Sequence, residues 1–144
     1  MLIGEHHHTL DDKKRVALPA KFRKELGKKV VVTHGLDRCL ALFAPKDWRL
    51  HLDKLQKLPL GQADARMLTR FVVGGAMEVE VDKAGRILIP DYQKNFAELK
   101  TDVVFVGLED RVEIWDKALW QEYKTTAGKQ ADLLAERFGK EGFL

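Results

Sequence analysis

The 144-residue sequence contains no serine and a single cysteine, Cys39. One cysteine excludes an intramolecular disulfide and is compatible with a reducing compartment. No apolar run approaches the roughly 20 residues that a membrane-spanning helix needs. The first residues lack the basic start and the apolar centre of a signal peptide. These absences predict a small soluble protein of the cytoplasm, with no membrane partner.

Charge is distributed unevenly along the chain, although the formal net charge is only +3. Residues 11–29 hold eight lysines and arginines against three carboxylates, so the rest of the chain is slightly acidic. Clustered cations raise the local potential that a polyanion experiences. Composition alone leaves two interpretations open, a surface for a polyanionic partner or a solvated lysine-rich face. With 45% hydrophobic and 33% charged residues, the chain can bury one ordinary core.

The chain contains one pattern twice, in residues 4–19 and again in residues 75–90. Apolar positions also match, and residues 30–43 resemble residues 103–115. Such a duplication predicts a pseudo-symmetric molecule whose functional residues occur in pairs. Four pairs are identical and equally spaced: Gly4 and Gly75, Asp11 and Asp82, Arg15 and Arg86, Pro19 and Pro90.

Each repeat is expected to open with a β-hairpin. Residues 77–81 alternate strictly between apolar and polar side chains, which is typical of a strand with one buried face. A three-residue turn and a second alternating strand follow in both repeats. Pro19 and Pro90 end those strands and favour short helices over 19–26 and 90–99, because proline is tolerated in the first turn of a helix. A second hairpin closes each repeat.

Helices are expected between and after the repeats. Residues 45–58 and 62–73 carry apolar side chains at helical spacing, which predicts two amphipathic connector helices. Residues 129–138 present a thin apolar stripe of Ala131, Leu134 and Phe138. That stripe suits packing on the chain's own core, which we favour, or on another subunit.

The turns between the paired aspartates and arginines have a defined geometry. In a three-residue hairpin loop the third position often requires positive φ, which glycine adopts without strain. Gly85 occupies this position in the second repeat, and Lys14 occupies it in the first. Asp11 and Arg15 then flank the first loop and are expected to form an ion pair across its mouth.

The occurrence of an arginine at this position in both loops suggests that it binds a ligand. An exposed ion pair contributes only about 0–1 kcal/mol to stability, so stability alone explains the repetition poorly. The planar guanidinium suits bidentate contact with a phosphate or with guanine O6 and N7. Lys13, Lys14 and Lys83 would add point charges beside it. The simpler alternative, a salt bridge that only stabilises the turn, stays open.

Catalysis is not expected, because the sequence has no serine, no glycine-rich phosphate loop and no HExxH motif. Cys39 lies in an apolar segment, where cysteine usually packs. His6 and His8 are equivalent in the repeat to Met77 and Val79, so we expect them to face inward rather than to bind a metal. We therefore predict no catalytic residue, no metal, no cofactor and no small-molecule substrate.

These motifs together resemble the bacterial MraZ family over about residues 1–124. The resemblance rests on the two Asp-x-x-x-Arg turns and on residues 18–23, 39–43, 82–90 and 112–115. It implies a mainly β fold with flanking helices (α+β), in which two tandem pseudo-symmetric repeats form a swapped-hairpin β-barrel related to AbrB and MazE. The implied division is residues 1–60 for the first repeat with a connector helix, 61–124 for the second connector helix and repeat, and 125–144 for a partly helical tail.

The resemblance also implies a function. MraZ proteins are transcriptional regulators that act as ring-shaped homo-oligomers on repeated promoter elements of the division and cell-wall gene cluster, and so associate with the nucleoid. Double-stranded DNA and the chain itself are the implied partners. An antitoxin-like or scaffold protein whose main partner is another protein is the alternative. The residues carried over to DNA binding are Asp11, Lys13, Lys14, Arg15, Asp82, Lys83 and Arg86.

Overall fold

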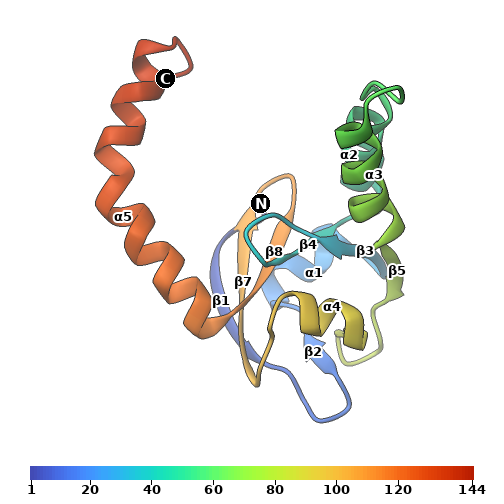
Figure 1. Cartoon of the computed structure of the whole chain (residues 1–144). Coiled ribbons are helices and arrows are strands. Elements are labelled where there is room, and N and C mark those ends of the chain that lie inside the picture. Colours follow the sequence, from blue (N-terminus) through green and yellow to red (C-terminus); the bar gives the residue numbers. More distant parts are fainter.

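The computed structural model describes all residues, 1–144, and has an α+β architecture with an antiparallel sheet flanked by helices (Figure 1). The α+β class predicted from the sequence is confirmed. The elements, in chain order, are β1 (Ile3–Thr9), β2 (Arg15–Ala17), α1 (Ala20–Leu26), β3 (Lys29–His34), β4 (Leu40–Phe43), α2 (Pro45–Gln56), α3 (Ala63–Gly74), β5 (Met77–Glu80), β6 (Arg86–Leu88), α4 (Asp91–Phe96), β7 (Asp102–Leu108), β8 (Val112–Asp116) and α5 (Lys117–Lys140).

The strands pair mainly between the two repeats. Six of them form one sheet in the order β1-β7-β8-β4-β3-β5, and β2 pairs with β6 in a separate two-stranded ribbon. All pairs are antiparallel. Strands β1, β2 and β3 of the first repeat thus pair with β7, β6 and β5 of the second. The two repeats therefore interleave and share one fold.

The hairpin expected at the start of each repeat forms only at its mouth. The Asp11 amide donates to the Arg15 carbonyl at 2.9 Å. Beyond this bond β1 and β2 do not pair with each other, because β1 pairs with β7 and β2 pairs with β6. Val16 and Ile87 lie directly opposite each other in the β2–β6 ribbon, and both are buried. Alternation thus predicted which face each strand buries, but not which strand lies beside it. The second hairpins, β3–β4 and β7–β8, pair as expected.

One core of 20 buried side chains draws on both repeats. Phe22 of α1 and Phe105 of β7 are among the largest side chains that are fully buried. The His6 ring packs edge-on against Phe22 at 4.7 Å, and the His8 ring packs against Phe105 at 5.5 Å. The prediction that these two histidines face inward is confirmed, although both are only half-buried.

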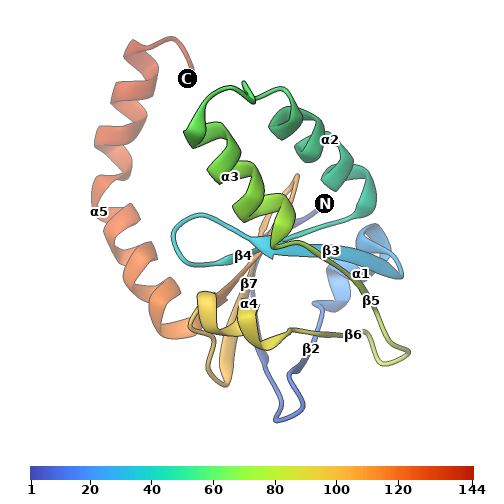
Figure 2. The same ribbon diagram turned by 45° about the vertical axis from the view of Figure 1, so that its right-hand side comes forward.

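Helices α1 to α4 begin near the predicted residues, and α4 ends where the backbone changes conformation. α1 and α4 follow Pro19 and Pro90, as expected. α4 ends at Phe96 rather than at residue 99, because Glu98 has a left-handed φ of 53°. α2 and α3 form an antiparallel pair at the end of the molecule opposite the β2–β6 ribbon (Figure 2).

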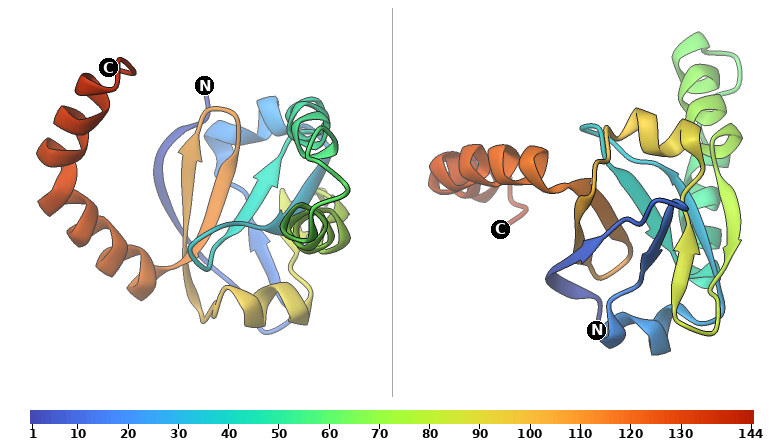
Figure 3. Two further views of the ribbon diagram at one scale, coloured as in Figure 1. Left: turned by 45° about the horizontal axis from the view of Figure 1, so that its top comes forward. Right: turned by 90° about the horizontal axis from the view of Figure 1, so that it is seen from below.

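The C-terminal helix begins twelve residues earlier than predicted and projects from the body (Figure 3). The Asp116 side chain caps it by accepting from the Leu119 amide at 3.3 Å. Its base is fixed to β1, since Trp120 Nε1 donates to a Glu5 carboxylate oxygen at 2.9 Å and Lys124 pairs with the same carboxylate at 3.1 Å. None of the helices combines the length and the apolar character needed to cross a membrane.

The expectation that the stripe on this helix packs on the chain's own core is wrong. No residue of α5 is buried, and Ala131 and Phe138 are exposed. The helix leaves β8 in a direction that carries residues beyond the first turns away from the sheet (Figure 3). Spacing along a helix predicts an apolar face but does not identify what that face packs against.

Candidate nucleic-acid interface

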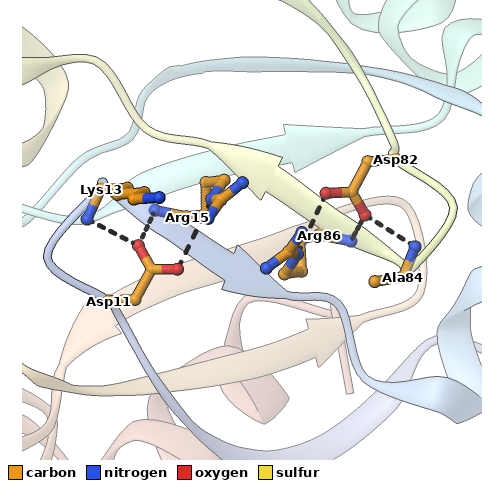
Figure 4. A network of polar contacts seen from close by, with 6 residues as sticks. All are labelled: Asp11, Lys13, Arg15, Asp82, Ala84 and Arg86. Atoms are coloured by element: carbon orange, nitrogen blue, oxygen red, sulfur yellow. Dashed lines mark hydrogen bonds and ion pairs between the residues drawn. The ribbon is translucent and has the colours of Figure 1, made fainter.

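The two Asp-x-x-x-Arg loops lie at opposite ends of the β2–β6 ribbon, in an approximate two-fold arrangement (Figure 4). Because successive side chains of a strand point to opposite faces, the buried pair Val16 and Ile87 faces the core. The alternate positions share the outer face of the ribbon. On that face Arg15 lies opposite Leu88, and Ala17 lies opposite Arg86. The ribbon thus brings the two arginines together as diagonal neighbours.

The first loop is closed by the carboxylate of Asp11. Its Oδ1 atom accepts hydrogen bonds from the backbone amides of Lys13 and Arg15, both at 2.9 Å. Its Oδ2 atom lies 3.5 Å from Nε of Arg15. Lys14 occupies the third loop position with φ of 63°, in the left-handed region. The predicted loop conformation and the predicted ion pair are both confirmed.

The second loop repeats this geometry (Figure 4). Asp82 Oδ1 accepts from the amides of Ala84 and Arg86 at 2.9 Å, and Gly85 has φ of 77°. Nε of Arg86 donates to Asp82 Oδ2 at 3.0 Å. The loop keeps its shape with either lysine or glycine in the third position, so Lys14 does not reshape the first loop.

The two loops differ in how their cations are held. Lys14 Nζ lies 2.7 Å from Oδ2 of Asp91, at the start of α4, so a residue of the second repeat neutralises this lysine. Arg15 Nε is buried and makes no hydrogen bond within the chain, whereas Arg86 Nε is bonded to Asp82. The Arg15 guanidinium is therefore the less restrained of the two.

Hydrogen bonding lowers the pKa of both loop carboxyls. For Asp11 the main cause is the backbone amide of Arg15, and the charges of Arg15 and Arg86 act in the same direction. For Asp82 the backbone amide of Arg86 is the main cause, followed by the Arg86 side chain. Because Asp11 experiences the charges of both arginines, the two loops form one electrostatic unit.

These shifts predict that the loops resist acid. A carboxyl whose pKa is lowered in the folded state stabilises that state above its unfolded pKa, near 3.8, and loses this contribution as the pH falls through the folded value. Carbon-13 NMR titration of the Asp11 and Asp82 carboxyls should give midpoints below 3.8 in the folded protein. The same carboxyls in urea-unfolded chain serve as the control. Folded midpoints at or above the unfolded ones would contradict the loop geometry.

The remaining chemical groups singled out in the sequence are packed. Cys39 is buried and donates to the Leu36 carbonyl at 3.1 Å, and burial raises the pKa of its thiol. Burial lowers the pKa of His8. No group of three or more histidine, cysteine or carboxylate side chains is arranged to hold a metal ion.

The structure adds two residues to the surface around the loops. Leu88 is 49% exposed on the outer face of the ribbon, next to Arg15. Leu88 lies two positions after Arg86 in β6 and therefore shares its face, so the spacing in the sequence could have indicated this position. Asp91 was not predicted, because its contact with Lys14 joins two repeats and leaves no local pattern. The structure brings Asp11, Arg15, Asp82 and Arg86 together, with Lys13, Lys14 and Lys83 on the loops.

Comparisons with known proteins agree with this duplicated arrangement. The chain matches the family model for MraZ protein, described as antitoxin-like, twice, over residues 1–71 and 72–138. A protein named transcriptional regulator MraZ from Caldanaerobacter subterraneus subsp. tengcongensis is 48% identical over 94% of this chain and 95% of its own length. Proteins of the same name from Moorella thermoacetica and Caldicellulosiruptor saccharolyticus are 47% and 44% identical, over 95% and 99% of this chain and 96% and 99% of their own lengths. The chain therefore belongs to the MraZ family.

Proposed function

We propose that this chain is a sequence-specific DNA-binding transcriptional regulator whose reading surface is the outer face of the β2–β6 ribbon. The observation that carries the proposal is the presence of Arg15 and Arg86 together on that face, each oriented by an aspartate of its own loop. Its relatives are named transcriptional regulators, which agrees with a non-enzymatic role.

The geometry suits the major groove of DNA. That groove is about 12 Å wide and admits a two-stranded β-ribbon. Arg15 and Arg86 would contact guanine O6 and N7, the pairing that arginine favours. Lys13 and Lys83 would contact phosphates and fix the register, and Lys14 would join them by exchanging its exposed ion pair with Asp91 for a phosphate. Asp11 and Asp82 would orient the guanidinium groups rather than touch the DNA, because a carboxylate is repelled by phosphate.

We also propose that the interleaved strands form a swapped-hairpin barrel of the AbrB and MazE type, with the two repeats and the tail divided as the sequence suggested. The exchange of pairing partners between the repeats supports this arrangement. In this arrangement one chain carries both reading loops, where a single-repeat chain would need a partner.

We further propose a ring-shaped homo-oligomer that binds repeated promoter elements of the division and cell-wall gene cluster, in the nucleoid. A single ribbon with few cations should bind weakly, whereas linked ribbons increase apparent affinity by about 10²–10⁴-fold. The stripe on α5 supports self-association, since no residue of this helix is buried and Ala131 and Phe138 are exposed.

Docking of another protein is the second candidate function. A cleft of about 480 Å³ lies between α2–α3 and the base of α5, and its lining includes Phe43, Trp115, Trp120 and Tyr123. Such an aromatic hollow suits a peptide or a protein segment. This candidate predicts that replacing the loop arginines leaves all interactions unchanged.

The test is fluorescence anisotropy on three labelled duplexes: a promoter fragment with several repeated elements, a single element and a scrambled sequence. The proposal predicts tightest binding to the several-element fragment, weaker binding to one element and weakest binding to scrambled DNA. Affinity should fall linearly with salt on logarithmic axes, with a slope of about 0.9 per phosphate contacted. Equal affinity for all three duplexes would contradict sequence-specific binding.

A further inference from the structure

The second loop has an arginine from the other repeat lying directly against it. Arg23 belongs to α1, in the first repeat, and its guanidinium covers Gly85 of the second loop. A Cβ atom added to Gly85 would lie only 2.4 Å from Cζ of Arg23. The guanidinium therefore occupies the space that a side chain at position 85 would fill, and glycine also adopts the positive φ of this position without strain.

The Arg23 guanidinium is held in a fixed orientation. Its Nε atom donates to the carbonyl of Leu18 at 3.0 Å, and the amide of Leu18 donates to the carbonyl of Gly85 at 2.8 Å. No carboxylate of the chain pairs with Arg23. Its two terminal nitrogens therefore remain as charged donors beside the loop.

The two loops thus obtain their third-position cation in different ways. Loop one carries Lys14 itself, and Asp91 neutralises it. Loop two carries Gly85, which has no side chain, and receives the Arg23 guanidinium from the first repeat. The residue of the second repeat that is equivalent to Arg23 is Lys94, so the repeat does not preserve the arginine. The cation beside loop two, Arg23, therefore has no carboxylate partner, whereas Lys14 of loop one pairs with Asp91.

We propose that Arg23 is a phosphate-contacting residue of the second loop, next to the base contact of Arg86. The proposal rests on the proposed DNA-binding function and adds a residue to its surface. A guanidinium offers a planar fork that matches a phosphate in a bidentate manner, and its orientation here is already fixed. The absence of a side chain at Gly85 lets a DNA backbone approach the guanidinium. Arg23 then fixes register and carries no sequence preference.

The test measures the affinity of Arg23→Gln and Arg23→Lys for a single-element duplex and for scrambled DNA across salt concentrations. Loss of one phosphate contact should reduce the log–log salt slope of Arg23→Gln by about 0.9 and weaken binding to both duplexes by the same factor. Arg23→Lys retains the charge and should keep the wild-type slope. Arg49→Gln removes an equally charged, exposed side chain on α2, far from the ribbon, and is the matched control.

An unchanged salt slope in Arg23→Gln would overturn the proposal. A fall in affinity that follows a lower melting temperature, with that slope unchanged, would make Arg23 a structural support of the loop. Arg86→Ala separates this proposal from the function on which it rests. If Arg86→Ala binds like the wild type, the DNA-reading function fails; if Arg86→Ala weakens binding while Arg23→Gln does not change the slope, only the Arg23 contact fails.

Discussion

Replacement of Phe105 by alanine is expected to lower the free energy of unfolding by about 3–5 kcal/mol. Phe105 is fully buried on β7 of the second repeat, directly opposite His6 of β1 in the first repeat. The cavity would remove contacts from both repeats, including the edge-on packing of His8. Because domains of this size are stable by only about 5–15 kcal/mol, the variant should be close to unfolding. Chemical denaturation followed by tryptophan fluorescence measures the loss.

The matched control is Leu60→Ala in the connection between α2 and α3. Leu60 is 79% exposed, so its replacement should change the free energy of unfolding by no more than about 0.5 kcal/mol. Similar losses at Phe105 and Leu60 would contradict a single core that both repeats share. Two separate denaturation transitions in the wild type would also contradict it.

The double variant Arg15→Ala/Arg86→Ala should lose sequence-specific DNA binding while it stays folded. Each bidentate contact between arginine and guanine contributes about 1–3 kcal/mol of discrimination, so losing two should weaken specific binding by about 30-fold to 10⁴-fold. Stability should change little, because both side chains are about one third exposed and exposed ion pairs contribute little. Anisotropy titration on the single-element duplex measures the affinity.

The control for this experiment is Arg49→Ala/Arg70→Ala, which removes the same charge from exposed positions on α2 and α3. It should retain specificity, since these helices lie at the opposite end of the molecule (Figure 2). Light scattering should give the wild-type size for both double variants. Specific binding that survives the loss of Arg15 and Arg86 would leave these residues with only a structural role in the turns.

Local features of this fold could be predicted from the sequence. The positive φ of Gly85 and Lys14 follows from the length of the loop and from the duplicated spacing of aspartate and arginine. The inward orientation of His6 and His8 follows from alternation along the strand. Each of these inferences uses residues a few positions apart, where backbone geometry fixes the outcome.

Partners that are distant in the sequence could not be predicted in the same way. Alternation in β2 identifies Val16 as buried but cannot identify β6 as the neighbouring strand. The apolar stripe on α5 has helical periodicity, but this periodicity does not predict that the helix projects from the body of the molecule. The contact between Arg23 and Gly85 joins residues of the two repeats that are distant in the sequence, so no sequence motif predicts it.

Photocrosslinking from the loops tests the central claim, a single DNA-reading surface built from both repeats, most directly. A benzophenone side chain is placed at Lys13, at Ala84, which is equivalent in the second loop, or at Lys54 on α2. Each protein is irradiated on the promoter fragment with several elements. We predict DNA crosslinks from Lys13 and Ala84 and none from Lys54. Crosslinks from Lys54 with none from either loop would contradict a reading surface on the β2–β6 ribbon.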